Sequence, residues 1–393
     1  MISSEENAKK IQMYIEQHPS CELPKRKSVT IKGKNQEIPV YKIPLDLLYY
    51  NIKNGRFAAQ YLEKVEELQR ELEPFSEDDK KIVQKLLLDL DPKKSLELQE
   101  NIFKLGQTEP AICSFDGQVY DGNRRMSVIQ NIRSLGNVEF NFLEVGILNK
   151  EVDKQDFWFI EAGIQFARDV QVNYGPINTL LKFREGINLG LAPIDIAKNI
   201  FGYKEDEKAI SEKIEILILI EQYLIFIGQP NKYLNAEMKV QHFIDLNAVL
   251  KSAEKEGFSI NDCITMQMIG FQLIHDGLGF KQIRKLKNIL QNEKAKKQMF
   301  EASKYCQEEN PGEKQKKKLE CEEQDIDTPT VTIFNSAIDE VQAKDSSDRP
   351  MSNLSRAYKN LENISPLNET IKSTEFQEQL QKLLKLAKKL EFN

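Results

Sequence analysis

The residues best suited to chemistry in this chain lie in one tight turn, expected to join a strand to a helix. Its sequence is Asp121-Gly122-Asn123-Arg124-Arg125. The first amide groups of a helix lack partners within the helix and attract anions, with help from the helix dipole. Glycine allows close approach of a ligand, and guanidinium groups match phosphate oxygens. The pattern predicts a phosphate-binding turn, and a capped helix with two surface arginines is the alternative.

The elements around this turn predict a small mixed αβ domain at residues 37–150. We expect a strand and turn at 37–48, a helix-rich region at 57–100 with an amphipathic helix at 95–105, strands at 110–115 and 118–120, a helix at 124–135, and a strand at 138–148. Asp116-Gly117 is a hairpin signal between the two middle strands, and Gly106 is placed to end a helix. The expected fold class is α+β: this domain is followed by an all-α domain and a C-terminal helix.

Three stretches of this domain carry motifs in a distinctive order. They are Ile43-Pro44-Leu45-Asp46-Leu47-Leu48 with Asn54-Gly55-Arg56, then Gly106-Gln107-Thr108-Glu109-Pro110-Ala111-Ile112-Cys113, then Gln118-Val119-Tyr120-Asp121-Gly122-Asn123-Arg124-Arg125-Met126-Ser127-Val128. Together they resemble the core of the ParB/sulfiredoxin superfamily, in which a glycine-ended helix, two short strands and a G-x-R-R turn follow one another. The resemblance covers about residues 37–150, with a helical insert around 62–94. A further segment at 159–168 occupies the place of the family's third motif.

The resemblance implies that the domain binds a nucleoside triphosphate, CTP or ATP, together with Mg²⁺. The residues that would hold the nucleotide come from all three motifs: Arg56, Gly122, Asn123, Arg124, Arg125, Gln165 and Arg168. Asp121 and Glu161 are the candidate catalytic and metal-binding carboxylates. A nucleotide-binding ParB-like domain is therefore the expectation for residues 37–150.

Two departures from the family narrow this expectation. Asn123 stands where sulfiredoxins carry a cysteine, so sulfinic-acid reduction is not expected. Ala162-Gly163 follow Glu161, whereas the family has an adjacent Glu-Asn pair that assists magnesium binding and hydrolysis. The residues therefore favour nucleotide binding over nucleotide hydrolysis.

Residues 151–300 are expected to form a helical domain, with helices at 232–256, 260–275 and 278–299 and a helix–turn–helix-like segment near 191–224. The segment begins in the place where ParB-type proteins carry their DNA-binding motif. Seven acidic residues against four lysines between 191 and 228 argue against phosphate contacts there. The better candidate surface for nucleic acid lies at 281–297 and includes Lys281, Arg284, Lys285 and Lys287, although a solvated helix face is the equal alternative.

The two ends of the chain are expected to lie outside these domains. Residues 1–36 form a helix, opened by the Ser3/Glu6 capping box, and a basic arm or linker. Residues 301–350 read as a linker with one short strand at Thr328–Phe334, and residues 351–393 hold the C-terminal amphipathic helix. Its apolar face at 374–392 comprises Phe376, Leu380, Leu383, Leu384, Ala387 and Leu390. Such an apolar face must be buried against another surface, and we expect a second copy of the chain, in a homodimer, to bury it.

Composition limits the possible classes of protein. The net charge of −6 excludes binding of nucleic acid by bulk charge, so any DNA contact must come from a local patch. The five cysteines form no CxxC pair, which argues against a zinc site and for a reducing cytoplasmic location. No apolar stretch is long enough to cross a bilayer, so no membrane partner is expected.

Two functions from different classes follow. The first is nucleotide-gated DNA binding, in plasmid partition or in a mobile-element or phage-defence setting. The second is a ParB-like nuclease or NTPase of a phage-defence or DNA-modification system. A scaffold that keeps the fold without catalysis is the third possibility.

Overall fold

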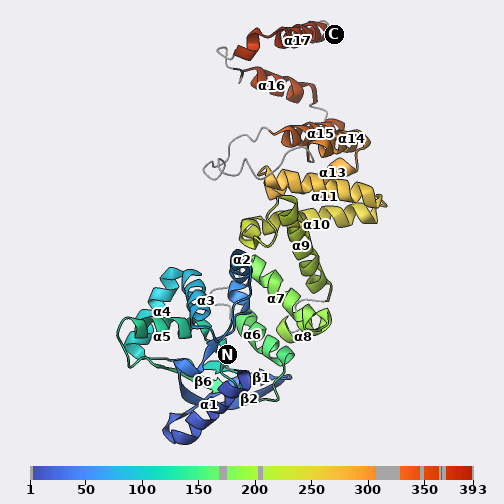
Figure 1. Ribbon diagram of the computed structural model, residues 1–393. Coiled ribbons are helices and arrows are strands. Elements are labelled where there is room, and N and C mark those ends of the chain that lie inside the picture. Colours follow the sequence, from blue (N-terminus) through green and yellow to red (C-terminus); the bar gives the residue numbers. More distant parts are fainter. Residues whose placement is uncertain are drawn as a thin grey trace.

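The computed structural model describes an elongated protein with a mixed αβ body at the N-terminal end and helices stacked beyond it (Figure 1). The described residues are 3–167, 175–201, 207–306, 328–345, 349–362, 364 and 369–391. The αβ body contains a six-stranded mixed sheet, and the remainder is helical. The expected α+β class, with an all-α part after the sheet, is confirmed at this level.

The N-terminal segment belongs to the αβ body. Helix α1 (Ser4–Gln17) starts with the expected capping box at Ser3 and Glu6. Its Asn7 amide donates to the backbone carbonyls of Leu47 (2.9 Å) and Asp116 (2.7 Å). The expected basic arm is wrong, because residues 22–31 form strand β1 (Glu22–Ile31), which pairs with β2 (Lys34–Pro44). Alternating burial along β1 shows the reason: Val29 and Ile31 are buried on one face of the strand, whereas Arg26, Ser28 and Thr30 are exposed on the other.

The sheet has the strand order β1-β2-β6-β4-β5-β3. Its inner strands meet in both directions: β2 is antiparallel to β6, β6 parallel to β4, β4 antiparallel to β5, and β5 parallel to β3. The remaining bounds are β3 (Tyr49–Tyr50), β4 (Ala111–Cys113), β5 (Gln118–Asp121) and β6 (Phe142–Ile147), with the 3-10 turn η2 (Leu45–Leu47) before β3. The hairpin at Asp116-Gly117 and the strands expected around it are confirmed.

Helices cover both faces of this sheet. One core joins the sheet to α3 (Glu77–Asp89), α4 (Pro92–Leu105) and α5 (Asn123–Ser134), and α4 ends at Gly106 as expected. The other face is covered by α6 (Lys154–Ala167), whose Phe157 and Ile160 pack with Ile112. The 3-10 turn η3 (Gly55–Phe57) and α2 (Ala58–Leu68) link β3 to the helices beyond the sheet. The loop that carries Arg56 therefore lies between the sheet and the helical part.

The helical part contains two further cores. The smaller core joins α6 to α7 (Pro176–Asn188), α8 (Pro193–Phe201) and the start of α9 (Glu207–Phe226). The larger core is formed by the rest of α9 with η4 (Tyr233–Lys239), α10 (Val240–Lys255), α11 (Ile260–His275), α12 (Phe280–Ile283), α13 (Leu286–Leu290), α14 (Glu293–Glu301), η5 (Ala302–Cys306) and α15 (Pro329–Asp345). The single helix expected at 278–299 is thus three short helices.

The strand expected at Thr328–Phe334 is also wrong, because this segment opens helix α15. Val331, Phe334, Ala337 and Ile338 are buried in the larger core, and their spacing has the helical period. The β-branched residues at 328–333 favour a strand, but the apolar residues that continue to Ile338 at helical spacing favour a helix. Part of the expected linker is therefore core, and the basic run at 314–318 lies outside the described residues.

The C-terminal end holds α16 (Arg349–Glu362), the 3-10 turn η7 (Glu369–Lys372) and α17 (Thr374–Glu391), which extend away from the helical cores (Figure 1). The amphipathic helix expected at 374–392 is confirmed. Its leucines 383, 384, 386 and 390 are exposed, as are Leu354 and Tyr358 of α16.

Candidate phosphate-binding site

Gly122 sets the geometry of the turn that joins β5 to α5. Its φ of 101° lies in the left-handed region, which favours glycine. A Cβ at this position would lie 2.6 Å from the Cβ of Ala111 on the neighbouring strand β4. Gly122 is therefore required by the turn and by its packing on β4, and the next residue, Asn123, begins α5.

The Asn123 side chain points into the protein. Its amide donates to the carbonyl of Val119 (2.7 Å), and its oxygen accepts from the backbone N–H of Asn51 (3.2 Å). Asn123 is buried. This residue therefore ties the turn to the loop that follows β3, and its side chain supports the site without facing a ligand.

Arg125 and Asp121 are paired with each other. The guanidinium of Arg125 lies 3.2 Å from the Asp121 carboxylate and also donates to the backbone carbonyl of Glu109. Both side chains are largely buried. Arg125 therefore fastens the start of α5 to the segment before β4, so the structure gives it a supporting contact instead of the phosphate contact expected from its sequence.

Arg124 is placed differently, and the charge of Arg56 acts on it. It is half-buried, and its Nε atom has no hydrogen-bond partner among the described residues. Burial lowers the pKa of the Arg124 guanidinium, and the nearby charge of Arg56 lowers it further, although Asp91 and Glu97 of α4 oppose this. Two arginines from separate sequence motifs thus influence each other electrostatically near the start of α5. Adjacent like charges of this kind attract an anion.

Glu161 has partners that leave it poorly placed for metal binding. Its carboxylate accepts from the Asn51 side-chain amide (3.1 Å) and the Gly55 backbone N–H (2.9 Å), and it lies 3.0 Å from the Lys182 ammonium. Asp121 has Arg125 as its own cationic partner. Each of the two expected metal-binding carboxylates is therefore paired with a separate basic side chain, and we assign neither of them to Mg²⁺.

Lys182 is the centre of a buried ionic cluster that the sequence analysis missed. Its ammonium contacts Glu161 and, at 2.8 Å, Glu185. Burial alone would lower the pKa of Lys182, but the two carboxylates raise it above its ordinary value. The available signal was a lysine inside the apolar run Leu180-Leu181-Lys182-Phe183, where a charge needs a partner. Of the expected third-motif residues, Arg168 and the Gln165 side chain lie outside the described part of the chain.

The segment expected to be helix–turn–helix-like contains helices α8 and α9, which share the smaller core through Ile196 and Ile210. Helix α9, which would read DNA, buries Ile210, Leu217 and Tyr223. Its Glu212 and Glu215 face Lys251 of α10 at 3.3 and 2.5 Å. Two acidic residues of α9 thus pair with α10, and acidic residues disfavour contact of this helix with DNA phosphates.

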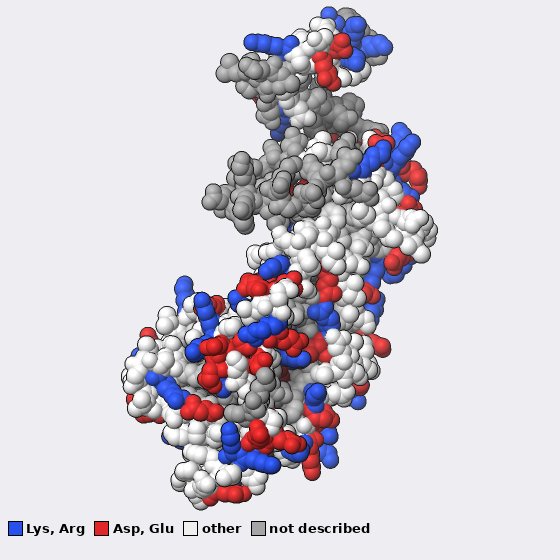
Figure 2. All heavy atoms as spheres, in the orientation of Figure 1, with Lys and Arg blue, Asp and Glu red and all other residues white. Residues whose placement is uncertain are grey.

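The expected nucleic-acid residues lie on or beside α12 and α13. Lys281 and Lys287 are exposed, whereas Arg284 lies over the Phe280 ring and is paired with Asp245 at 2.8 Å. Figure 2 shows that basic and acidic side chains are interspersed on the visible face of the molecule. Of the four residues, the lysines remain available for phosphate.

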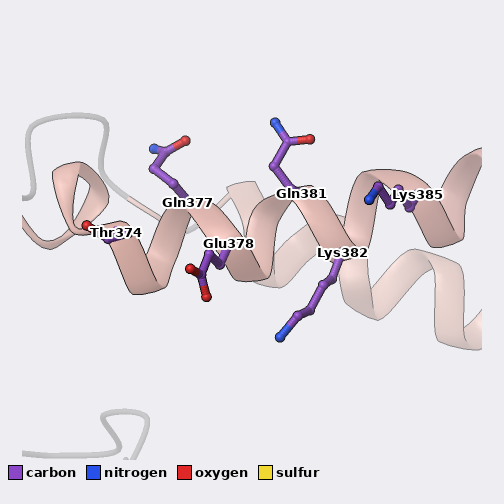
Figure 3. A pocket seen from close by; sticks show the side chains of 6 residues that line it. All are labelled: Thr374, Gln377, Glu378, Gln381, Lys382 and Lys385. Carbon is purple, nitrogen blue, oxygen red and sulfur yellow. The ribbon is translucent and has the colours of Figure 1, made fainter.

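A hollow of about 430 Å³ runs along α17 (Figure 3). It is lined by Thr374, Gln377, Glu378, Gln381, Lys382 and Lys385. All six belong to the polar face of one helix, so no second element supplies converging groups. The hollow lacks the features of a ligand site.

Comparisons do not assign the chain to a family. No family model matches it, and no curated protein matches it. Among the residues described by the structure, no cluster of three or more His, Cys, Asp or Glu could hold a metal ion. The helices described here include none with the length and apolar character needed to cross a membrane.

Proposed function

We propose that this protein is a ParB-like nucleotide-binding protein whose nucleotide, CTP or ATP with Mg²⁺, controls its binding to DNA. The single observation that carries the proposal is the half-buried Arg124 in the first turn of α5, whose Nε has no hydrogen-bond partner among the described residues. A triphosphate would neutralise both guanidinium groups and supply acceptors for the unpartnered Nε of Arg124. Cleavage of DNA is not favoured, because Asp121 and Glu161 are engaged with basic side chains.

The nucleotide proposal is tested by thermal unfolding with CTP, ATP, GTP and inorganic triphosphate, each with Mg²⁺. A ligand at 100 times its Kd stabilises the folded state by about 2.7 kcal/mol, which raises Tm measurably. Arg124→Ala should abolish the shift. Arg133→Ala is the matched control. Arg133 lies on the same helix, α5, but its guanidinium pairs with Asp46. An unchanged Tm with all four ligands contradicts the proposal.

DNA binding is assigned to the lysines at 281, 285 and 287. The double variant Lys281→Glu/Lys287→Glu should weaken DNA binding and reduce its salt dependence, because each phosphate contact releases counterions. Lys255→Glu, at the exposed end of α10, serves as the control. Mobility shifts at low and moderate salt, with and without nucleotide, are the measurement. No binding under any condition would remove DNA from the proposal.

Two copies of the chain are proposed to meet through α17. Phe376, Leu380, Leu383, Ala387 and Leu390 recur at spacings of four and three residues, as in a coiled-coil seam. Acidic residues lie near its start and lysines near its end, which suits an antiparallel pair. Leu383→Glu should convert a dimer to a monomer in sedimentation or light scattering. A wild-type protein that is monomeric at high concentration contradicts this arrangement.

A further inference from the structure

The loop at residues 51–57 connects the two halves of the molecule and carries Arg56. One side of the loop is bonded to the phosphate-binding turn, since the N–H of Asn51 donates to the Asn123 oxygen at 3.2 Å. The other side is bonded to α6, because Glu161 accepts from Asn51 and Gly55. The backbone around Arg56 is thus held from two directions.

Helix α7 provides the third attachment, through Asn178. Its amide group donates to the backbone carbonyl of Arg56 at 3.0 Å. Its oxygen accepts from the N–H of Ala59 at 2.8 Å, in the first turn of α2. Asn178 is buried, so both bonds form away from water, where their loss has a large effect. One side chain of the helical part therefore fixes the backbone carbonyl of Arg56.

Helix α7 also supplies the positive charge that pairs with Glu161, the residue of α6 that holds the loop. Lys182, one turn after Asn178, contacts Glu161 and lies over the Trp158 ring at 5.6 Å. Without this ammonium, the buried Glu161 carboxylate that accepts from Gly55 would lose the cation 3.0 Å from it. The position of α7 therefore determines both contacts that hold the loop on its far side.

We infer that Asn178 is a positioning residue for the phosphate site: it holds the backbone of Arg56 in the loop that is bonded to the phosphate-binding turn, and it makes anion affinity depend on the position of α7. The inference rests on the proposed function, because it requires that Arg56 contact the anion. It adds a mechanical link between that site and the first helix after α6. Movement of α7 would withdraw Arg56, and a bound polyphosphate would in turn hold α7 in place, since such coupling is reciprocal.

A double-mutant cycle in the full chain tests the inference. Asn178→Ala, Arg56→Ala and the double variant are titrated with inorganic triphosphate and Mg²⁺ by calorimetry. Asn178→Ala should weaken binding by about tenfold in the wild-type background, in line with the loss of buried hydrogen bonds. In the Arg56→Ala background it should have no further effect, because Asn178 acts through Arg56.

Two further variants separate positioning from general damage. Asn178→Asp retains the acceptor for the Ala59 N–H and loses the donor to the Arg56 carbonyl, so it should weaken binding while the fold is preserved. Thr179→Ala, the neighbouring change on α7, should bind like the wild type. Equal losses from Asn178→Ala in both backgrounds overturn the inference and leave the phosphate site intact. A wild-type protein that binds no triphosphate overturns the inference together with the proposed function.

Discussion

Replacement of Lys182 by methionine gives the most direct test of the buried ionic cluster. The lysine side chain is 1% exposed, and its ammonium lies 3.0 Å from Glu161 and 2.8 Å from Glu185. Methionine keeps an unbranched apolar stem and removes the charge. The variant therefore isolates the effect of leaving two carboxylates without their common cation.

Loss of one partner from a buried ion pair destabilises a protein by about 3–5 kcal/mol. We expect Lys182→Met to destabilise the protein by an amount within this range at neutral pH, because Glu161 is also buried and two carboxylates lose the cation they share. Adding Glu161→Gln removes one of these charges and retains an acceptor for Gly55. The double variant should therefore recover about half of the loss.

The loss should also depend on pH. Burial raises the pKa of Glu185, with a further contribution from Glu161, whereas Lys182 lowers it. Removing the lysine raises the folded-state pKa of Glu185 further. A carboxyl group with a raised folded pKa contributes full stability below its unfolded pKa of about 4.3, and this contribution is lost as pH rises through the folded value. Lys182→Met should thus be closer to the wild type at pH 5 than at pH 8.

The chain provides its own probe for this experiment. Trp158 is the only tryptophan, and its indole N–H donates to the Lys182 carbonyl at 3.1 Å. Urea unfolding followed by tryptophan fluorescence at pH 5 and pH 8 therefore reports on the region of the cluster. Lys154→Met, an exposed change on α6, is the control. A loss below about 1 kcal/mol at pH 8, or one that does not vary with pH, would refute the reasoning.

Three further predictions address the turn, the helical insert and the corrected helix. Gly122→Ala should lower Tm, measured by circular dichroism, because the left-handed backbone and the 2.6 Å approach to Ala111 both exclude a side chain; an unchanged Tm would contradict this. Arg70 donates to Asp79 at 2.7 and 2.8 Å and lowers the pKa of that carboxyl. The stability difference between Arg70→Ala and the wild type should therefore be present at pH 7 and shrink as pH falls through the folded pKa of Asp79; urea titrations at several pH values that show a constant difference would oppose it. Phe334→Ala should destabilise the larger helical core by about 3–5 kcal/mol in urea unfolding, whereas a surface or linker position would show almost no change.

Local sequence signals predicted the elements that depend on near neighbours. The Ser3/Glu6 capping box, the glycine end of α4, the Asp116-Gly117 hairpin and the strand–turn–helix at 118–134 are all present. These features arise from backbone preferences and hydrogen bonds within a few residues. The same reasoning failed at 328–334, where β-branched residues favoured a strand but burial in the helical core produced a helix.

The partners of several charged residues were decided by tertiary structure. Arg124 and Arg125 look equivalent as phosphate ligands by sequence, yet Arg125 is paired with Asp121 and with the carbonyl of Glu109, whereas the Nε of Arg124 has no partner among the described residues. Glu161 looks like a metal ligand until Lys182 is placed beside it. The physical reason is that a charge finds its partner through folding, often across many residues of sequence, and its chemistry depends on which partner it finds. The sequence by itself determined where an anion site could form, and the packing of α5, α6 and α7 decided which side chains remain to form it.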